Sequence, residues 1–333
     1  MTDAAGDPTG ARALLPFAPP ELGGLPEGWQ AVVWDGPGPA PADSALEAVE
    51  FFVVPYTRTS AAVPVLGRLP TLRVVQSLSA GVEDLLPHVA PEVTLCNARG
   101  VHDTSTAEHA VTLLLAIMRG VPDLVRAQEA QRWSAGFRPA LADRTVLIVG
   151  YGAIGAAVEA RLVPFECDVL RVARSARPAP RGPVHAMAEL PSLLPQADAV
   201  VLTVPLAERT RGMVDAGFLA RLKDGAVLVN VGRGAVVDTA ALLAELRSGR
   251  LGAALDVTDP EPLPPGHALW TAPNTLISPH VAATTSAFRP RALALVRSQL
   301  ARYAAGEPLA NVVTADRGRQ AAGPRRQPGE PGS

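Results

Sequence analysis

The fold of this 333-residue chain is decided by the stretch Val146–Gly155, which reads VLIVGYGAIG. Its four apolar residues predict a buried strand, and the glycines that follow have the spacing GxGxxG at the start of a helix running through Arg161. In this setting Gly150 makes the tight turn, Gly152 lets the backbone approach a pyrophosphate, and Gly155 lets helix and strand pack closely. Free N–H groups and the helix dipole favour an anion there. The stretch therefore predicts a dinucleotide-binding domain.

Apolar runs of strand length continue on both sides of this motif and alternate with helical segments. Continuous apolar strands, separated by amphipathic stretches such as Asp238–Ser248, indicate a parallel sheet covered by helices on both faces. Six such runs correspond to the doubly wound nucleotide-binding plan. A last helix is expected over residues 286–305, and the tail beyond Val313 is expected to be disordered. The six expected strands are Val146–Val149, Val169–Val172, Ala199–Val204, Ala226–Val231, Ala253–Val257 and Thr275–Ser278.

The first hundred residues carry another set of short apolar runs between Pro/Gly-rich turns. Ser105 and Glu108 then have the spacing of a capping box, which predicts the start of a long apolar helix that stops at Gly120. Pro122 is placed to open a further helix, running to about Arg132. The strands expected in this part are Ala31–Trp34, Phe51–Val54, Leu72–Gln76 and Val93–Cys96.

Composition and charge exclude several classes of function. Basic residues number 30 and acidic residues 32, and the net charge of -2 argues against a nucleic-acid or membrane binder that works by bulk electrostatics. All basic residues but Lys223 are Arg, so lysine chemistry has one candidate and anion binding falls to Arg. Cys96 and Cys167 form neither a disulfide framework nor a CxxC zinc motif. We expect both thiols to be buried and reduced, and we expect no metal site.

No targeting or membrane segment is indicated by the sequence. Met1–Gly10 lacks the basic start and apolar run of a signal peptide. The longest apolar runs are too short to span a bilayer. We therefore expect a cytoplasmic protein.

The end of the second strand of the nucleotide-binding domain bears on which dinucleotide is preferred. A site specific for NAD usually places a carboxylate there to bind the ribose 2′-hydroxyl. Asp168 lies at the wrong end of this strand, whereas Arg174 and Ser175 follow its carboxyl end, with Arg177 and Arg181 nearby. Arg and Ser can bind a 2′-phosphate. NADP is the preferred cofactor on this reading, and NAD with an Arg-rich solvent loop is the alternative.

Three further polar side chains follow strands of the same expected sheet. Arg233 lies in a Gly-Arg-Gly turn whose glycines would let the backbone approach a ligand, and Arg is suited to bind a carboxylate. Glu261 and His280 follow the next two strands. Because ligands bind at the carboxyl ends of parallel strands, these three residues can converge beside the glycine turn. A carboxylate next to a His raises the imidazole pKa and produces an acid that works near neutral pH.

The order of these motifs resembles the D-isomer-specific 2-hydroxyacid dehydrogenase family. GxGxxG is followed by Val-Gly-Arg-Gly, by Asp-Val-(x)3-Glu-Pro and by Ser-Pro-His-x-Ala, while Ser79–Val82 and Thr106–Glu108 also fit the family pattern. The resemblance extends from about residue 50 to residue 313. It implies an NAD(P)-dependent oxidoreductase that transfers a hydride between the cofactor and a small 2-oxo acid or D-2-hydroxy acid, with glyoxylate and hydroxypyruvate as the first candidates.

The resemblance also implies roles for individual residues. Arg233 would bind the carboxylate of the 2-oxo acid, His280 would donate the proton, and Glu261 would keep His280 protonated. In the loop that begins at Ser79, the backbone N–H groups of Ala80 and Gly81 would bind a carboxylate oxygen. Asp256 would bind the nicotinamide amide. The complete set expected at the cofactor is Thr106, Gly150, Gly152, Ala153, Ile154, Gly155, Arg174, Ser175, Thr203, Pro205, Val231, Asp256, His280 and Ala282.

The architecture implied by the family has two α/β domains with doubly wound parallel sheets. A Rossmann cofactor domain, residues 104–283, would be inserted into a flavodoxin-like substrate-binding domain made of residues 1–103 and 284–313. The helices around 104–140 would form an arm that embraces the partner of a homodimer. Residues 314–333 would be the disordered tail.

Two alternative functions remain open at this point. One is an NAD-linked dehydrogenase of the phosphoglycerate type, although no basic cluster near Ser79–Val82 supports a phosphate site. The other is a non-catalytic dinucleotide sensor of the corepressor type, which has the same fold. Formate dehydrogenases have Gln where this chain has Glu261, so formate is not the expected substrate. The remaining histidines are interpreted as structural or surface residues: His88, His102, His109, His185 and His267.

Overall fold

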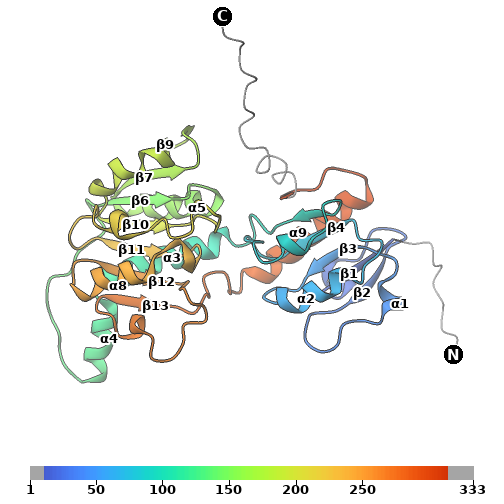
Figure 1. Ribbon diagram of the computed structural model, residues 1–333, viewed down its shortest axis with the longest axis horizontal. Coiled ribbons are helices and arrows are strands. Elements are labelled where there is room, and N and C mark those ends of the chain that lie inside the picture. The colour runs from blue at the N-terminus through green and yellow to red at the C-terminus, as the bar shows by residue number, and fades with distance from the viewer. Residues whose placement is uncertain (1–10, 314–333) are drawn as a thin grey trace, which may run out of the picture. The chain divides into compact units, whose positions relative to one another are not determined.

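The computed structural model describes residues 11–313, which form two compact units (Figure 1). The inserted unit is His102–Ala287, and the flanking unit consists, within the described residues, of 11–101 and 288–313. The expectations about Met1–Gly10 and about the tail at 314–333 concern segments outside the described residues.

The flanking unit contains a five-stranded parallel sheet in the order β2-β1-β3-β4-β5. This is the strand order of flavodoxin-like doubly wound folds. Neighbouring side chains of the central strand point to opposite faces, so Phe52 packs in one core and Phe51 in the other, where α9 covers the sheet. The elements are β1 Arg12–Leu15, β2 Gln30–Val33, α1 Asp43–Leu46, β3 Val49–Val54, α2 Thr59–Leu66, β4 Val74–Ser77, β5 Thr94–Cys96 and α9 Phe288–Ala304.

The inserted unit contains an eight-stranded sheet in the order β13-β12-β11-β10-β6-β7-β9-β8, parallel except for the last pair. Its strands are β6 Thr145–Val149, β7 Asp168–Ala173, β8 Arg177–Ala179, β9 Gly182–Ala186, β10 Ala199–Leu202, β11 Val227–Asn230, β12 Gly252–Leu255 and β13 Thr275–Ile277. Its helices are α3 Asp103–Met118, α4 Val121–Glu129, α5 Ala153–Leu162, α6 Leu190–Leu193, α7 Ala216–Leu219 and α8 Thr239–Arg247. The fold class predicted from the sequence is confirmed for both units.

Helices cover both faces of the inserted unit's sheet, as the continuous apolar strands predicted. On β6, Leu147 and Val149 pack in the core that contains α7 and α8, whereas Val146 and Ile148 pack in the core that contains α3 and α5. The sheet thus has no solvent-facing side along β6, and its ligand-binding positions are at the ends of the strands.

Several expected elements differ in detail from those observed. Strand β1 and the antiparallel pair β8–β9 were not expected. The capping box is wrong: α3 begins at Asp103 after His102, without a side-chain cap, so Ser105 lies inside the first turn. There its hydroxyl lies 2.8 Å from that of Thr285 and is not available to cap the helix. Cys96 is buried as expected, but Cys167 is only half-buried.

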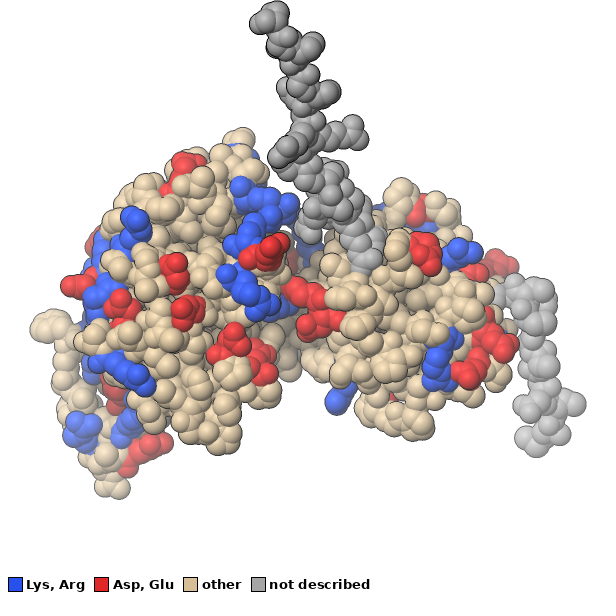
Figure 2. All heavy atoms as spheres, viewed as in Figure 1, with Lys and Arg blue, Asp and Glu red and all other residues tan. Residues whose placement is uncertain are grey.

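Charged side chains of both signs are present over each unit. Figure 2 shows basic side chains beside acidic ones on the face that it displays. Some charged side chains of the inserted unit form ion pairs, such as Lys223 with Asp198 and Arg250 with Glu245. None of the helices in the described part of the chain combines the length and the apolar character needed to cross a bilayer.

Candidate active site

The carboxyl ends of the parallel strands lie at one edge of the inserted unit's sheet, which is where open α/β sheets bind ligands. The predicted functional residues follow these strand ends in order across the sheet. The glycine turn follows β6, Thr203 follows β10, Arg233 follows β11, Asp256 follows β12, and His280 follows β13.

The three glycines of the turn differ in what surrounds them. Gly150 has a φ of 108°, and a Cβ there would lie 2.7 Å from the backbone N of Val204. A Cβ at Gly155 would lie 2.8 Å from the carbonyl O of Gly150. At Gly152 the nearest protein atom would be 3.9 Å away. Protein packing therefore explains Gly150 and Gly155, whereas the space beside Gly152 can accept a ligand.

The turn is held from the neighbouring strand and opens a helix with a receptive N-terminus. Thr203 Oγ1 donates to the carbonyl O of Gly150 at 2.8 Å, and Thr203 N donates to the carbonyl O of Val149 at 2.9 Å. Helix α5 has neither a side-chain cap nor an acidic residue in its first turn. Its N-terminal N–H groups and dipole can therefore receive a phosphate.

A buried polar network lies beneath the turn. No sequence pattern indicates it, because its members come from three different elements. The Tyr151 hydroxyl donates to Glu159 on α5, and Arg171 on β7 forms an ion pair with the same carboxylate. Burial raises the pKa of the Tyr151 hydroxyl, and Glu159 raises it further. Burial opposes ionisation of Glu159, but hydrogen bonds from Arg171 and Tyr151 outweigh it and lower the Glu159 pKa. The network ties the turn to β7.

Arg174 and Ser175 follow β7 and are exposed. Residues 173–178 read Ala-Arg-Ser-Ala-Arg-Pro, without an acidic side chain. Asp168 is the first residue of β7 and therefore lies at the opposite end of the strand. Arg177 reaches back to the glycine turn, where its Nη2 donates to the carbonyl O of Tyr151 at 2.5 Å. The loop after β7 thus has two guanidinium groups and no carboxylate over residues 173–178.

Arg233 is held in a turn that allows no side chain on either side of it. A Cβ at Gly232 would lie 2.8 Å from the carbonyl O of Val204, and a Cβ at Gly234 would lie 1.8 Å from the carbonyl O of Thr258. Close approach of the backbone of two neighbouring loops therefore accounts for these glycines, and the approach of a ligand to them stays a prediction. Asn230 Nδ2 donates to the carbonyl O of Arg233 at 3.0 Å and fixes the turn further.

His280 and Glu261, which follow two neighbouring strands, form a hydrogen-bonded pair. Nδ1 of His280 lies 2.5 Å from Oε1 of Glu261, and this hydrogen bond raises the pKa of His280 against the opposing effect of burial. The positive charge of Arg233 acts in the opposite direction to Glu261. The side chains of His280 and Glu261 are 46% and 39% exposed, so a substrate can reach them. The backbone of His280 has a φ of 53°, in the left-handed region.

Asp256 is 2% exposed and collects hydrogen bonds from the loop around His280. Its carboxylate accepts from the Ser278 hydroxyl at 2.6 Å, from Val281 N at 2.9 Å and from Ala282 N at 3.1 Å. His109 of α3 also lies 3.3 Å from it. Burial opposes ionisation, yet these hydrogen bonds hold the pKa of Asp256 below its usual value. Nothing in the sequence indicated that His109 reaches this loop, since a single His in an apolar helix does not reveal its partner.

The loop after β4 in the flanking unit has its carbonyl groups held by neighbours. Ala98 N donates to the carbonyl O of Ser79 at 2.9 Å, and Asn97 Nδ2 donates to the carbonyl O of Ala80 at 3.0 Å. Ser79 N donates to the Ser77 hydroxyl at 3.0 Å. Because an N–H group shares a peptide plane with the preceding carbonyl, these contacts also fix the directions of the N–H groups of Ala80 and Gly81.

The other residues expected at the cofactor occupy positions of differing exposure. Thr106, Val231 and Ala282 are buried, Ala153 and Ile154 are half-buried, and Pro205 is exposed. His185 pairs with Glu189, and His267 accepts from the backbone N of Leu269, so both have structural partners. Among residues 11–313, no cluster of His, Cys, Asp or Glu is suited to hold a metal ion.

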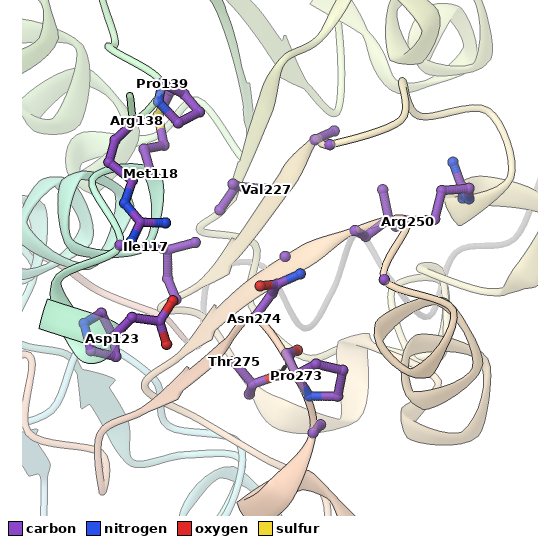
Figure 3. A pocket seen from close by; sticks show the side chains of 18 of the residues that line it. Ile117, Met118, Asp123, Arg138, Pro139, Val227, Arg250, Pro273, Asn274 and Thr275 are labelled. Atoms are coloured by element: carbon purple, nitrogen blue, oxygen red, sulfur yellow. Dashed lines mark hydrogen bonds between the residues drawn. The ribbon is translucent and has the colours of Figure 1, made fainter. Parts of the chain in front are cut away.

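A cavity of about 690 Å³ lies at the opposite end of the strands of this sheet, where β11, β12 and β13 begin. Figure 3 shows Asp123 and Arg138 on one side of it and Val227, Arg250 and Asn274 on the other. Because the strands are parallel, this cavity is a full strand length from the edge that carries Arg233 and His280. It does not belong to the candidate active site.

A GxGxxG turn, an Arg and a carboxylate-bound His at one edge of a parallel sheet define a dinucleotide-dependent dehydrogenase. The family model described as "D-isomer specific 2-hydroxyacid dehydrogenase, NAD binding domain" matches residues 111–282. The chain belongs to this family. It is an NAD(P)-dependent oxidoreductase that transfers a hydride between the cofactor and a 2-oxo or 2-hydroxy acid.

Individual relatives are consistent with the family match. The chain is 33% identical over 249 residues to a glyoxylate reductase/hydroxypyruvate reductase of Homo sapiens, covering 72% of this chain and 76% of the relative. An NADPH-dependent glyoxylate/hydroxypyruvate reductase of Sinorhizobium meliloti, solved with NADP and sulfate, is 30% identical with a TM-score of 0.79, covering 91% of this chain and 98% of that one. A family protein of Aeromonas salmonicida is 29% identical with a TM-score of 0.80, covering 91% and 98%.

The surroundings of Gly152 give a sharp test of how this chain accommodates the dinucleotide. Gly152→Ala should fold with an unchanged melting temperature, because no protein atom would meet the new Cβ within 3.9 Å. It should weaken binding of the cofactor by about tenfold or more, because the methyl group would occupy the space of the pyrophosphate. Fluorescence titration with NADPH measures this. Gly150→Ala is the contrasting variant, which should unfold at a clearly lower temperature. Unchanged cofactor binding in Gly152→Ala would place the pyrophosphate elsewhere.

Proposed function

We propose that this chain is an NADPH-dependent reductase of small 2-oxo acids, with glyoxylate and hydroxypyruvate as its substrates. The observation that carries the proposal is the His280–Glu261 hydrogen bond of 2.5 Å at the sheet edge that also presents Arg233. A protonated imidazole next to a guanidinium group is suited to an anionic 2-oxo acid whose carbonyl oxygen takes up a proton. The human and Sinorhizobium meliloti relatives have names that include both compounds.

The residues of the site divide the work of reduction among them. Arg233 binds the substrate carboxylate with its planar fork and polarises the neighbouring carbonyl group. His280 donates the proton that turns the carbonyl oxygen into a hydroxyl. Glu261 accepts from Nδ1 of His280, which leaves the Nε2–H as the proton donor. NADPH, when bound, supplies the hydride. The reverse reaction uses the same groups, with His280 as the base.

We propose that the cofactor lies along the edge from β7 to β13. The glycine turn and the N-terminus of α5 hold the pyrophosphate, and Asp256 binds the nicotinamide amide through Oδ2, which accepts only Ala282 N among the hydrogen bonds found for residues 11–313. Buried Thr106, Val231 and Ala282 enclose the nicotinamide end. Ala153, Ile154, Thr203 and Pro205 complete the site.

The flanking unit is proposed as the substrate-binding domain, corresponding to residues 1–103 and 284–313. Its sheet carries the loop of Ser79, Ala80 and Gly81, whose two oriented N–H groups can bind a carboxylate. Residues 104–283 are proposed as the cofactor domain. The free thiols of Cys96 and Cys167 are compatible with a reducing compartment, and we propose the cytoplasm.

A substrate panel tests the proposed activity. Purified protein is mixed with NADPH or NADH and with glyoxylate, hydroxypyruvate, pyruvate or 2-oxoglutarate, and the loss of absorbance at the nicotinamide band is followed. Turnover of the first two with NADPH is the expected result. Oxidation of 3-phosphoglycerate with NAD in their place would favour the phosphoglycerate-type dehydrogenase. Cofactor binding without any turnover would favour the non-catalytic sensor.

Arg174 and Ser175 are proposed to read the 2′-phosphate of NADPH. Arg174→Ala should weaken NADPH binding by about tenfold or more, the value of one charge-assisted hydrogen bond to a phosphate. Binding of NADH should change little, because NADH lacks that phosphate. Isothermal titration with both cofactors checks the difference. Arg181→Ala, a nearby Arg in the hairpin, is the matched control. Equal losses for NADPH and NADH would contradict the assignment.

The arm expected over residues 104–140 is proposed as the contact surface of a homodimer, with its segment Val121–Pro139 as the main contact. It carries two almost fully exposed aromatic side chains, Trp133 at 96% and Phe137 at 108% of their reference areas. Val121, Leu124 and Val125 of α4 are also exposed. Apolar side chains concentrated on one segment are typical of a protein–protein interface rather than of a solvent-facing surface.

A double variant of the arm tests the dimer. Trp133→Ser combined with Phe137→Ser should convert a dimer into a monomer at micromolar concentration, because aromatic anchors contribute most of the binding energy of such interfaces. Light scattering coupled to gel filtration measures the mass. Trp270→Ser is the matched control, since Trp270 is 51% exposed and lies outside the arm. A double variant with the mass of a dimer, or a monomeric wild type, would contradict the proposal.

A further inference from the structure

His109 lies in a chain of hydrogen bonds that ends at the loop of His280. Its Nε2 is 2.9 Å from the Ser278 hydroxyl oxygen and 3.3 Å from Oδ1 of Asp256. Ser278 is in turn 2.6 Å from the same carboxylate oxygen. The three side chains come from α3, from the end of β12 and from the end of β13, so they join elements that are far apart in the sequence.

The chemistry of the three groups fixes the direction of these hydrogen bonds. Asp256 is ionised and can only accept, so the Ser278 hydroxyl must give it its single proton. The Ser278 oxygen is then an acceptor toward His109, which requires the proton of His109 to be on Nε2. His109 thus donates to Ser278, and Ser278 donates to Asp256. The His109–Ser278 and Ser278–Asp256 hydrogen bonds are therefore both made when the proton of His109 is on Nε2.

Asp256, which is held by Ser278 and His109, in turn binds the backbone on both sides of His280. Its carboxylate accepts from Val281 N and Ala282 N, directly after His280, and its backbone carbonyl accepts from His280 N at 2.8 Å. The loop is therefore held on both sides of a residue whose φ of 53° is unfavourable for a non-glycine residue. A backbone in this conformation persists only when its surroundings hold it there.

We propose that His109 is a positioning residue of the reaction, acting through Ser278 and Asp256 to hold His280 against Glu261. This inference rests on the proposed role of His280 as the proton donor. The hydrogen bonds and ion pairs found for His109 within residues 11–313 join it to Ser278 and Asp256, so its proposed effect reaches the proton donor through the loop.

Two substitutions that differ by one methylene group test the proposal. His109→Gln places an amide N–H near the position of Nε2 and should keep kcat within about twofold of the wild type. His109→Asn is polar as well but too short, and it should lower kcat about tenfold, the order expected when a catalytic group loses its support. The melting temperature reports on the fold and should remain close to the wild-type value in both variants.

The pH dependence of kcat gives a readout that a purely structural role would not change. The charged groups that act on His280 are Glu261, Arg233 and Asp256. Since the hydrogen bond to Glu261 raises the pKa of His280, reduction should persist at low pH and fail as pH rises through that raised pKa. His109→Asn should loosen the His280–Glu261 contact, so that kcat for reduction declines at a lower pH than in the wild type. In His109→Gln, kcat should decline at the wild-type pH.

A matched control and a reference variant distinguish an error in the role of His109 from an error in the role of His280. His185→Asn alters a His of similar exposure, 26% against 24%, that is also bound to a carboxylate, and it should leave kcat unchanged. Wild-type kcat and pH dependence in His109→Asn, or an equal loss in His109→Gln, would overturn the role of His109 while His280→Ala is still inactive. An active His280→Ala would instead overturn the proposed proton donor itself.

Discussion

His280→Ala should lower kcat for reduction of the 2-oxo acid by about 10³-fold, within the range of rate gains attributed to general acid catalysis. The variant has no group that can give a proton to the carbonyl oxygen, whereas Arg233 and the glycine turn remain to bind substrate and cofactor. KM for the 2-oxo acid and the dissociation constant for NADPH should therefore change little. Stopped-flow measurement of NADPH oxidation at saturating substrate separates this chemical step from binding.

Glu261→Gln tests how the carboxylate of Glu261 supports His280 as the proton donor. The amide cannot stabilise the imidazolium, so the pKa of His280 should fall toward its ordinary value. The rate of reduction should then begin to decline at lower pH than in the wild type. His88→Ala, in the flanking unit, is the control for removal of an imidazole. Retention of more than about a tenth of wild-type kcat by His280→Ala would show that another group supplies the proton.

Arg233→Ala should lower kcat/KM for the 2-oxo acid by about 10³-fold or more, because a bidentate, charge-assisted contact with the substrate carboxylate is lost. The loss should appear in both constants, since Arg233 binds the ground state and polarises the carbonyl group. Arg233→Lys should recover only part of it, because an ammonium group is a point charge without the planar fork. Steady-state kinetics against varied glyoxylate measures the two constants.

Guanidinium ion in the assay gives an independent check on Arg233. It should restore part of the activity of Arg233→Ala and none of the activity of His280→Ala. Arg221→Ala, at an exposed position after α7, controls for the loss of one positive charge from the same unit. Wild-type KM for glyoxylate in Arg233→Ala would move the carboxylate contact to another residue.

The course of the parallel sheets could be predicted from the sequence because buried strands are continuous apolar runs. The six strands of the nucleotide-binding plan were each located to within a few residues. The pair β8–β9 was missed because Pro178 and Pro183 argue against strands. Pro178 is tolerated because β8 is the edge strand, and Pro183 lies opposite Pro178, outside the part of β9 that pairs with β7. Strand β1 was missed because Arg-Ala-Leu-Leu has no preference for strand over helix.

The contacts of the candidate site could be predicted only where the strand ends determine them. His280 and Glu261 were expected to meet because they follow neighbouring positions of one sheet edge. The approach of His109 to Asp256 depends on how α3 packs across the sheet, and the Tyr151–Glu159–Arg171 network depends on side chains reaching under the turn. Neither has a spacing that a sequence pattern can report. The glycines around Arg233 were assigned to a ligand, and close approach of another loop leaves the same sequence signal.

The backbone conformation of His280 limits how the thermal stability of this enzyme can be increased. A left-handed residue other than glycine costs on the order of 1 kcal/mol or more. His280→Gly should therefore melt at a higher temperature than His280→Ala, although both lack the proton donor. At this position a selection for thermal robustness alone would favour an inactive chain. Thermal stability and catalytic activity thus favour different residues at position 280. A more stable and still active enzyme must therefore be obtained by substitutions at other positions.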